Sequence, residues 1–233
     1  MSVSTEDSPK RSAQGSVRRD YNSPVIKKGH RAGEKPPNAG RRFPAEILTQ
    51  DEVRALIGAC SNRAPTGIRN RALLVMMYRG GLRLSEALAL RPKDVDADAG
   101  TVVILHGKGD RRRTLGLDPG AFAVLARWRD RRERLGLNGH HPLFCTLDGR
   151  SMHTSYVRTL LPRLAKKAGI EKRVHPHGLR HTYAYELAVA EGKPAPLIQA
   201  ALGHSSLATT DRYLRHIAPA ELIETMRSRE WSL

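Results

Sequence analysis

The sequence predicts an α+β fold that is mainly α-helical, with a small antiparallel β-sheet or hairpin. Apolar residues recur at helical spacing over most of the chain after residue 44, and capping signals mark where helices begin and end. One β-branched stretch, 101–106, is followed by a glycine-containing turn and a returning stretch at 111–117. With 233 residues and 39% hydrophobic content, the chain can form one domain plus an extension, or two small domains.

The charge of the chain points to a polyanionic partner. Forty Lys and Arg residues stand against 23 Asp and Glu residues, a formal net charge of +17. Such an excess favours nucleic acid as the partner, with a ribosome-like or merely solubilised surface as the alternative. No apolar run approaches membrane-spanning length and the start is polar, so we expect a cytoplasmic, nucleoid-associated protein without membrane contact.

Residues 1–44 are interpreted as a basic, disordered tail, and 45–233 as the folded domain. The first segment is rich in Ser, Pro, Gly, Lys and Arg and has few large apolar residues, so it cannot offset the entropy of ordering. Two interpretations remain open for it. It is either an arm that lies along the DNA backbone and adds salt-dependent affinity, or a leader without a role.

The folded part begins with two predicted helices. Thr49 and Glu52 form a capping-box pattern ahead of an apolar helical stretch. A second helix is predicted over 68–78, where the methionines fill the core and the following Gly-Gly pair ends the helix. Arg83 follows that pair after one residue, Leu82, and Ser85 is expected to cap a short helix over 86–90. Taken alone, an arginine in this place is more often a solvated surface residue.

A hairpin with a lysine at its tip is predicted next. Lys108 stands in the turn 107–110, where its side chain can reach into a minor groove or toward a leaving oxygen. A loop lysine in water is the ordinary alternative. The arginines that follow predict phosphate contact in either case, and these are Arg111, Arg112 and Arg113.

A long helix is predicted over 120–135, started by Asp118-Pro119 and ended by Gly136. Its cationic face is either solvated or in contact with DNA. The residues of that face are Arg127, Arg129, Arg131, Arg132 and Arg134.

A short strand is then expected at 143–146, and a helix at 154–168 that Pro162 kinks or breaks. Cys60 and Cys145 share no metal-type spacing and are expected to be core thiols in a reducing compartment.

The C-terminal region carries the clearest chemistry. A helix is predicted over 178–190, and a second from Pro194 to Gly203, which fits the left-handed position that ends a helix. His204 would sit in the following turn, and Ser205 or Ser206 would cap a third helix carrying Tyr213. A last helix, over 218–229, has a small apolar stripe that packs either on its own domain or on a neighbouring subunit.

His177 and Arg180 are three residues apart, so on a helix they share a face. A guanidinium matches phosphate geometry, histidine moves protons near neutral pH, and a tyrosine hydroxyl becomes a nucleophile once its proton is taken. This set suits attack on a phosphodiester without a metal or cofactor. His175 and His181 are assigned to local hydrogen bonding. The spacing of His175 and His177 could suggest zinc, but no third ligand accompanies them.

These segments resemble the tyrosine recombinases of the phage integrase family. HGLRHT, LGHSS and Tyr213 are similar to that family's C-terminal signature, and the earlier segment GLRLSE, which contains Arg83, also matches. HGKGDRRR supplies the hairpin lysine, and the matches run in order from Leu48 to Ile217. The resemblance implies a catalytic set and a structural role for Glu86. The set is Arg83, Lys108, His177, Arg180, His204 and the nucleophile Tyr213.

The resemblance also implies a mechanism and partners. Tyr213 would attack the scissile phosphate and form a 3′-phosphotyrosyl link, with His177 as base and Lys108 as general acid. Four protomers would act on two duplexes of double-stranded DNA, without metal or ATP. The chain resembles short members that lack the usual N-terminal core-binding domain, or a truncated relative. Without DNA we expect the protomers to be weakly associated or monomeric. An accessory DNA-bending or core-binding protein is a further expected partner.

Three functions remain open at this point. The first is a site-specific DNA recombinase, which the GLRLSE and LGHSS segments favour. The second is a type IB topoisomerase, which reseals the same strand. The third is a catalytically idle DNA-binding module kept for its positive charge.

Overall fold

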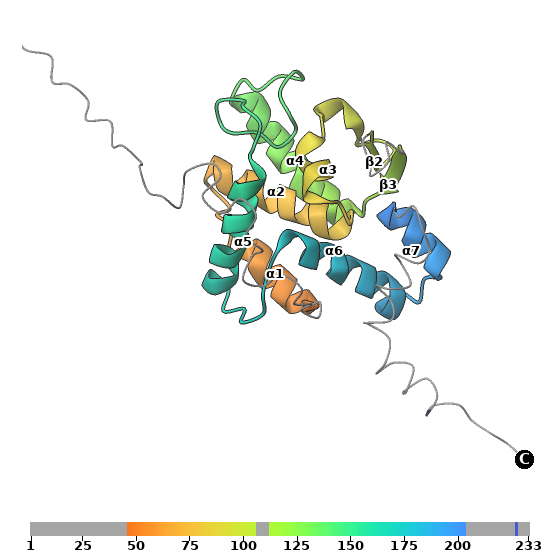
Figure 1. Cartoon of the computed structure of the whole chain (residues 1–233). Helices are drawn as coiled ribbons and strands as arrows, with labels where there is room; N and C mark the ends of the chain where they lie inside the picture. The colour runs from red at the N-terminus through yellow and green to blue at the C-terminus, as the bar shows by residue number, and fades with distance from the viewer. Residues whose placement is uncertain (1–45, 106–111, 204–226, 228–233) are drawn as a thin grey trace, which may run out of the picture. The chain divides into compact units, whose positions relative to one another are not determined.

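The computed structural model describes residues 46–105, 112–203 and 227, which belong to a unit bounded at Pro44 and Leu233 (Figure 1). The predicted fold class is confirmed, because helices dominate the described part and pack with a three-stranded antiparallel sheet. The predicted tail and most of the segment after Gly203 lie outside the described residues. The α-helices are α1 (Gln50–Gly58), α2 (Pro65–Arg79), α3 (Leu84–Ala89), α4 (Pro119–Arg134), α5 (Thr154–Lys167), α6 (Pro176–Tyr185) and α7 (Ala195–Leu202).

Helix α2 is the centre of the core, and α4 and α6 both pack against it (Figure 1). Eleven of its fifteen residues are buried, including Met76 and Met77, which confirms the methionines as core residues. The helix begins at Pro65, three residues before the predicted start, because proline is tolerated in the first turn. Helix α1 begins with the predicted capping box, in which Thr49 Oγ1 accepts from the amide of Glu52.

The predicted hairpin is confirmed as β2 (Thr101–Ile104) and β3 (Arg113–Gly116), paired antiparallel. A short first strand, β1 (Val95–Asp96), pairs with β2 and was not predicted, since two residues are too few for a periodic pattern. It follows a short 3₁₀ helix, η2 (Pro92–Asp94). The predicted turn at 107–110 lies outside the described residues.

Helix α4 begins as predicted, with Asp118 accepting from the amide of Ala121. One of its arginines fits neither interpretation of the cationic face. Arg132 is only 4% exposed, and its guanidinium donates to the carbonyls of Asn138, His141 and Pro142. It therefore fastens the loop after α4 to the helix.

The strand predicted at 143–146 is wrong, whereas the helix predicted at 154–168 is confirmed and is not broken at Pro162. Residues 143–146 form no strand apart from an isolated bridge between Cys145 and Ser151, because this segment is fixed by side chains instead. Trp128 Nε1, for example, donates to the carbonyl of Leu143 at 2.8 Å. Helix α5 continues through Pro162, which is exposed. Water can therefore satisfy the backbone carbonyl that loses its hydrogen-bond partner at the proline. Buried residues on either side of Pro162 hold the helix on the core.

The predicted helix over 178–190 has two parts. Helix α6 passes directly into a π-helical turn, η3 (Glu186–Ala190). Glu186 is buried there, because its carboxylate accepts from the hydroxyl of Tyr78 and lies 3.5 Å from Arg79 Nη1. Helix α7 then ends, as predicted, at Gly203 in the left-handed conformation, with φ of 62°.

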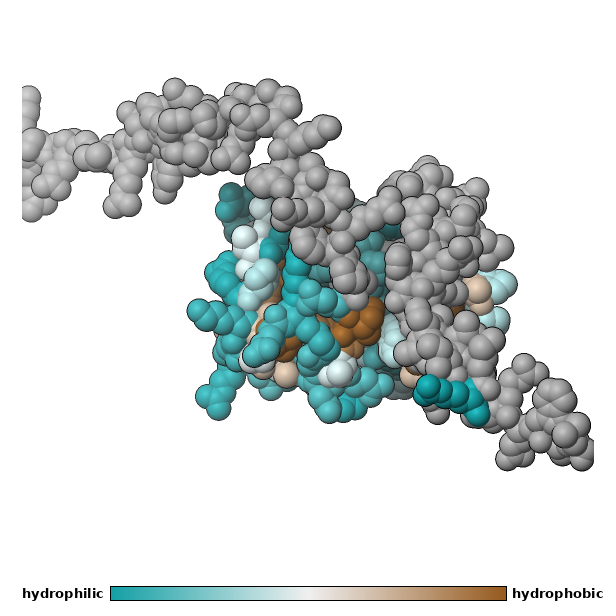
Figure 2. All heavy atoms as spheres, turned by 60° about the horizontal axis from the view of Figure 1, so that its bottom comes forward, coloured by the Kyte–Doolittle hydropathy of each residue, from teal (hydrophilic) through white to brown (hydrophobic). Residues whose placement is uncertain are grey.

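Figure 2 shows one face on which hydrophilic residues surround a smaller hydrophobic area. Cys60 and Cys145 are both buried and free, which confirms them as core thiols. Within the described ranges, no helix has the length and apolar character needed to cross a membrane.

Candidate active site

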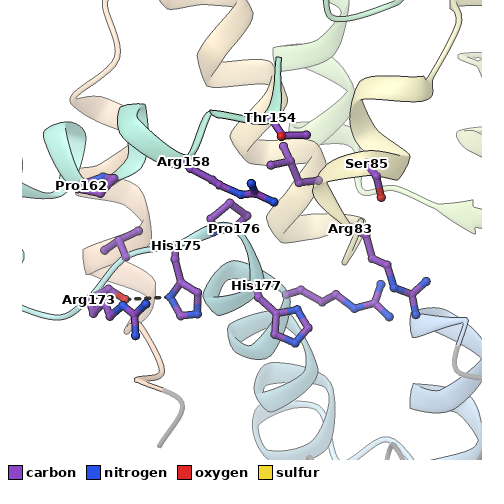
Figure 3. A pocket seen from close by; sticks show the side chains of 12 residues that line it. Arg83, Ser85, Thr154, Arg158, Pro162, Arg173, His175, Pro176 and His177 are labelled. Atoms are coloured by element: carbon purple, nitrogen blue, oxygen red, sulfur yellow. Dashed lines mark hydrogen bonds between the residues drawn. The ribbon is translucent and has the colours of Figure 1, made fainter. Parts of the chain in front are cut away.

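A pocket of about 570 Å³ opens where the N-termini of α3, α5 and α6 meet. Its lining is rich in basic side chains, which Figure 3 shows gathered around the start of α6. The basic residues that line it are Arg83, Arg158, Arg173, His175, His177 and Arg180. The sequence-predicted residues Arg83, His177 and Arg180, which lie up to 97 positions apart in the chain, therefore share one pocket.

Arg83 occupies the N-cap position of α3, which corrects the expectation that Ser85 caps this helix. Its backbone amide donates to Glu86 Oε2 at 2.9 Å, so the glutamate three residues on satisfies the helix end. Ser85 instead lines the pocket. Gly81, which precedes this helix, has φ of 56°, and a Cβ there would lie 2.4 Å from the ring of Tyr183. A glycine is therefore required for the approach to Arg83.

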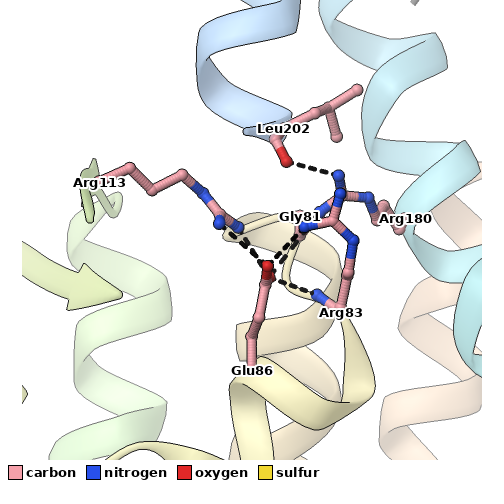
Figure 4. A network of polar contacts seen from close by, with 6 residues as sticks. All are labelled: Gly81, Arg83, Glu86, Arg113, Arg180 and Leu202. Atoms are coloured by element: carbon pink, nitrogen blue, oxygen red, sulfur yellow. Dashed lines mark hydrogen bonds and ion pairs between the residues drawn. The ribbon is translucent and has the colours of Figure 1, made fainter. Parts of the chain in front are cut away.

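Glu86 is the centre of an arginine cluster (Figure 4). Its side chain is 2% exposed and accepts from Arg83 Nη1 at 2.6 Å. Arg113 donates to both of its oxygens, at 3.0 Å and 2.7 Å, and Arg180 Nη1 lies 3.9 Å from Oε2. Burial raises the pKa of the Glu86 carboxyl, but the hydrogen bonds from Arg113 and from the Arg83 amide lower it to about 2. The carboxylate is thus an anion at neutral pH and orients guanidiniums.

Arg180 is 1% exposed and is held by two backbone carbonyls. Its Nη1 donates to Gly81 at 2.6 Å and its Nη2 donates to Leu202, the last residue of α7. Arg180, which is predicted to bind phosphate, thus also links the segment before α3 to the end of α7. Such a guanidinium is preorganised, because its contacts with the protein fix its position and its charge is permanent.

His177 stands in the first turn of α6, beside the pocket (Figure 3). Although the residue is exposed overall, partial desolvation and the positive charge of Arg180 lower its pKa below the usual 6.5. The ring is therefore neutral at pH 7 and able to accept a proton. His181 packs edge-on against it, with ring centroids 4.4 Å apart. His175 Nδ1 lies 3.2 Å from the carbonyl of Arg173, a local contact of the kind expected.

The structure leaves part of the predicted set untested. Lys108, Arg111, His204 and Tyr213 lie outside the described residues. Arg112 is exposed, whereas Arg113 is bound to Glu86, so phosphate contact by either of them stays a prediction.

Sequence reasoning missed part of the pocket wall. Arg158 on α5 and Arg173, in the segment between α5 and α6, both line the pocket. Arg158 belongs to no motif, and only its place near the N-terminus of an amphipathic helix could have drawn notice. Arg173 ends a basic run that leads to the signature segment, which was a usable signal.

The arrangement can bind one anionic group and move one proton. Two guanidiniums held by protein contacts face a space that a neutral imidazole also borders. Arginines match the oxygens of a phosphate, and a neutral histidine can act as a general base.

Comparisons with known proteins agree with this chemistry. The phage integrase family matches residues 46–219. A tyrosine recombinase XerC from Xanthomonas axonopodis pv. citri (strain 306) is 36% identical over 200 residues, covering 84% of this chain and 63% of the relative. A XerC from Xylella fastidiosa (strain 9a5c) is 36% identical over 194 residues, covering 81% of this chain and 64% of the relative. The chain thus spans just under two thirds of the length of these relatives.

Solved structures show the same fold. The crystal structure of XerA recombinase superposes with a TM-score of 0.70 at 30% identity, covering 85% of this chain and 70% of that one. The XerH site-specific recombinase bound to palindromic difH substrate, a post-cleavage complex, gives a TM-score of 0.67 at 29% identity and covers 83% of this chain and 55% of that one. The family match covers most of the sequence, the relatives are 36% identical and the fold is shared. This chain therefore belongs to the phage integrase family.

Proposed function

We propose that this chain is the catalytic part of a site-specific DNA recombinase that cuts and rejoins double-stranded DNA through a 3′-phosphotyrosyl intermediate. The observation that carries the proposal is the convergence of Arg83, His177 and Arg180 on one pocket, with Glu86 and backbone carbonyls fixing the two arginines. Phosphoryl transfer needs charge stabilisation at fixed positions, and these contacts supply it.

The DNA backbone would lie along the basic wall of the pocket. Arg83 and Arg180 would hold the non-bridging oxygens of the scissile phosphate, and Arg158 and Arg173, which line the same pocket, would meet neighbouring phosphates. The net charge of +17 would add affinity that falls as salt rises. The contacts expected of Arg111 and Arg112, and of the basic tail, belong to this same proposal.

The reaction exchanges one phosphodiester for another. The Tyr213 oxygen attacks phosphorus, its proton passes to His177, and a bond forms between that oxygen and the 3′ phosphate. The bond from phosphorus to the 5′ oxygen breaks, and Lys108 protonates the departing oxygen. His204 donates a further hydrogen bond to the non-bridging oxygens in the transition state. A 5′ hydroxyl from a second strand then attacks the phosphotyrosine and releases Tyr213. The phosphotyrosyl link conserves the energy of the phosphodiester bond, so no ATP is required. The arginines and His204 would supply the charge stabilisation that a metal ion gives in other phosphoryl transfers.

Recombination between two duplexes needs several protomers. We expect four copies of the chain on two duplexes, with the terminal segment 218–229 as the link between neighbours, and weak association without DNA. The names of the similar XerA, XerC and XerH recombinases support this function. A core-binding or DNA-bending protein is also among the expected partners.

Covalent trapping tests the proposal and identifies the target site in the same experiment. The protein is incubated, without metal, with nicked duplexes whose central sequence is randomised, and adducts that survive denaturant are recovered and sequenced. Tyr213→Phe is treated in parallel. We expect an adduct with the original protein only, and enrichment of a defined sequence around the nick.

The outcome separates the remaining functions. An adduct that also forms with Tyr213→Phe contradicts the proposed nucleophile, and DNA binding with no adduct in either protein indicates an idle binding module. When an enriched site is present on two labelled duplexes, strand transfer between them supports recombination. Resealing within one duplex alone would point to topoisomerase-like activity.

A further inference from the structure

Arg113 differs from the arginine that precedes it, although the sequence predicts phosphate contact for both. Its side chain is 11% exposed, whereas Arg112 is exposed to solvent. The guanidinium of Arg113 faces inward and donates to both oxygens of Glu86. A bidentate pair of this kind fixes both distance and orientation.

Arg113 contacts Glu86 together with Arg83, a predicted catalytic residue. Glu86 Oε1 accepts from Arg83 Nη1 at 2.6 Å and from Arg113 Nη1 at 3.0 Å. Figure 4 shows Arg113 approaching the carboxylate from β3, while Arg83 and Arg180 approach it from α3 and α6. The position of the carboxylate therefore depends on Arg113, and the position of Arg83 depends on the carboxylate.

Arg113 also lies against the turn that ends α7. A Cβ placed on Gly203 would be 2.9 Å from both Cδ and Nη1 of Arg113, so the arginine packs directly on the glycine backbone. His204 follows Gly203 in the sequence. In the sheet, Arg113 pairs with Ile104 at the end of the β2–β3 ladder, and the segment joining these strands contains Lys108.

We propose that Arg113 is a positioning residue that holds three parts of the active site in register, namely the Glu86–Arg83 pair, the base of the hairpin that carries Lys108, and the Gly203 turn that precedes His204. It acts through these contacts and does not bind DNA. This inference rests on the proposed function, and it replaces phosphate binding by Arg113 with a role in geometry.

The test separates the rate of strand cleavage from affinity for DNA. Arg113→Ala and Arg113→Lys are compared with the original protein for single-turnover adduct formation on the enriched nicked duplex at saturating protein. Noncovalent binding and its salt dependence are measured with the same substitutions in a Tyr213→Phe background. Arg79→Ala is the matched control, because Arg79 also bridges carboxylates, Asp118 and Glu186, but lines no part of the pocket.

We expect Arg113→Ala to slow adduct formation roughly 10²-fold, the effect of a displacement of about 1 Å at the reacting groups. Its dissociation constant and salt slope should stay unchanged. Arg113→Lys should restore part of the rate, because an ammonium reaches one Glu86 oxygen but cannot span both. Arg79→Ala should lower thermal stability as much as Arg113→Ala does, but it should leave the rate of adduct formation unchanged. If Arg113→Ala does not fold, the lysine variant carries the test.

Two results would overturn the inference while leaving the proposed function intact. One is an unchanged cleavage rate in Arg113→Ala. The other is a salt slope reduced by about one charge with a normal rate at saturation, which marks a phosphate ligand. Failure of the original protein to form any adduct would instead count against the proposed function, so the two failures are distinguishable.

Discussion

Two buried carboxylates, Glu86 and Glu186, show how similar local chemistry serves different purposes. Their side chains are 2% and 8% exposed, and each is paired with arginine. Around Glu86, three guanidiniums meet one carboxylate, which leaves two positive charges in excess. Among the described residues, one guanidinium, that of Arg79, lies at Glu186 and is shared with Asp118, and the hydroxyl of Tyr78 donates to the same carboxylate.

The two clusters differ in net charge. Positive charge held in excess at a pocket is costly unless an anion arrives, so the Glu86 cluster is suited to binding one. The Glu186 cluster has no surplus cation. Burial and the neighbouring Glu186 raise the pKa of the Tyr78 hydroxyl, which keeps that tyrosine protonated and a hydrogen-bond donor. The second cluster therefore stabilises the junction of α2, α6 and η3 without reactive chemistry.

The largest expected difference between the clusters is in rate. Arg180→Ala removes a charge from the pocket and should lower single-turnover adduct formation roughly 10³-fold, the upper range for loss of one preorganised donor. Arg79→Ala, at the other cluster, should leave that rate within about twofold when the two proteins are compared at equal folded fraction. Equal losses in both variants would show that the two clusters do not differ in role.

The second prediction concerns stability in acid. The pKa of Glu86 is about 2, below its ordinary value of 4.5, so its ionised form stabilises the fold above pH 4.5 and this stabilisation is lost as pH falls toward 2. The loss should amount to about 3 kcal/mol, from the size of the pKa shift. Urea unfolding from pH 6 to pH 2 should show it in the original protein, and Glu86→Gln should be less stable at pH 6 and lose less on acidification.

The third prediction concerns the base. Because the pKa of His177 is lowered from 6.5, the imidazole stays neutral at pH 7, and adduct formation should fall only as pH drops below 6.5. His177→Gln should lower the rate roughly 10²-fold and remove that acid limb, as expected for loss of a general base. A Tyr78→Phe variant at the Glu186 cluster should keep the limb. An identical pH profile in His177→Gln would assign proton removal to another group.

The smallest expected effect concerns the glycine that precedes Arg83. Gly81→Ala should destabilise the fold by about 2 kcal/mol, because φ is 56° and the added methyl would meet the Tyr183 ring. Gly136, with φ of 70°, has open space around its Cα, so Gly136→Ala should cost only about 1 kcal/mol. Chemical denaturation of the two variants measures both losses of unfolding free energy. Equal losses would mean that the Tyr183 ring moves aside without strain.

Sequence reasoning succeeded where local chemistry dominates. The capping box at Thr49 and the left-handed Gly203 follow from residues within one helical turn, and both were predicted. The break that was one of two alternatives at Pro162 does not occur, because core packing on either side outweighs the local signal. Sequence reasoning failed at Ser85, where the carboxylate of Glu86 took the capping role from a residue with the usual preference.

The candidate site divides in the same way. The sequence nominated His177 and Arg180 through their spacing and side-chain chemistry, and Arg83 through the resemblance of its GLRLSE segment to the family, because the identity of a reactive side chain can be read from the sequence. The orientation of Arg113 toward Glu86, the packing of that arginine on Gly203 and the place of Arg158 in the pocket wall were decided only by tertiary structure. These contacts join residues 27 to 90 positions apart, and such pairings depend on how the helices pack on α2 rather than on any local preference.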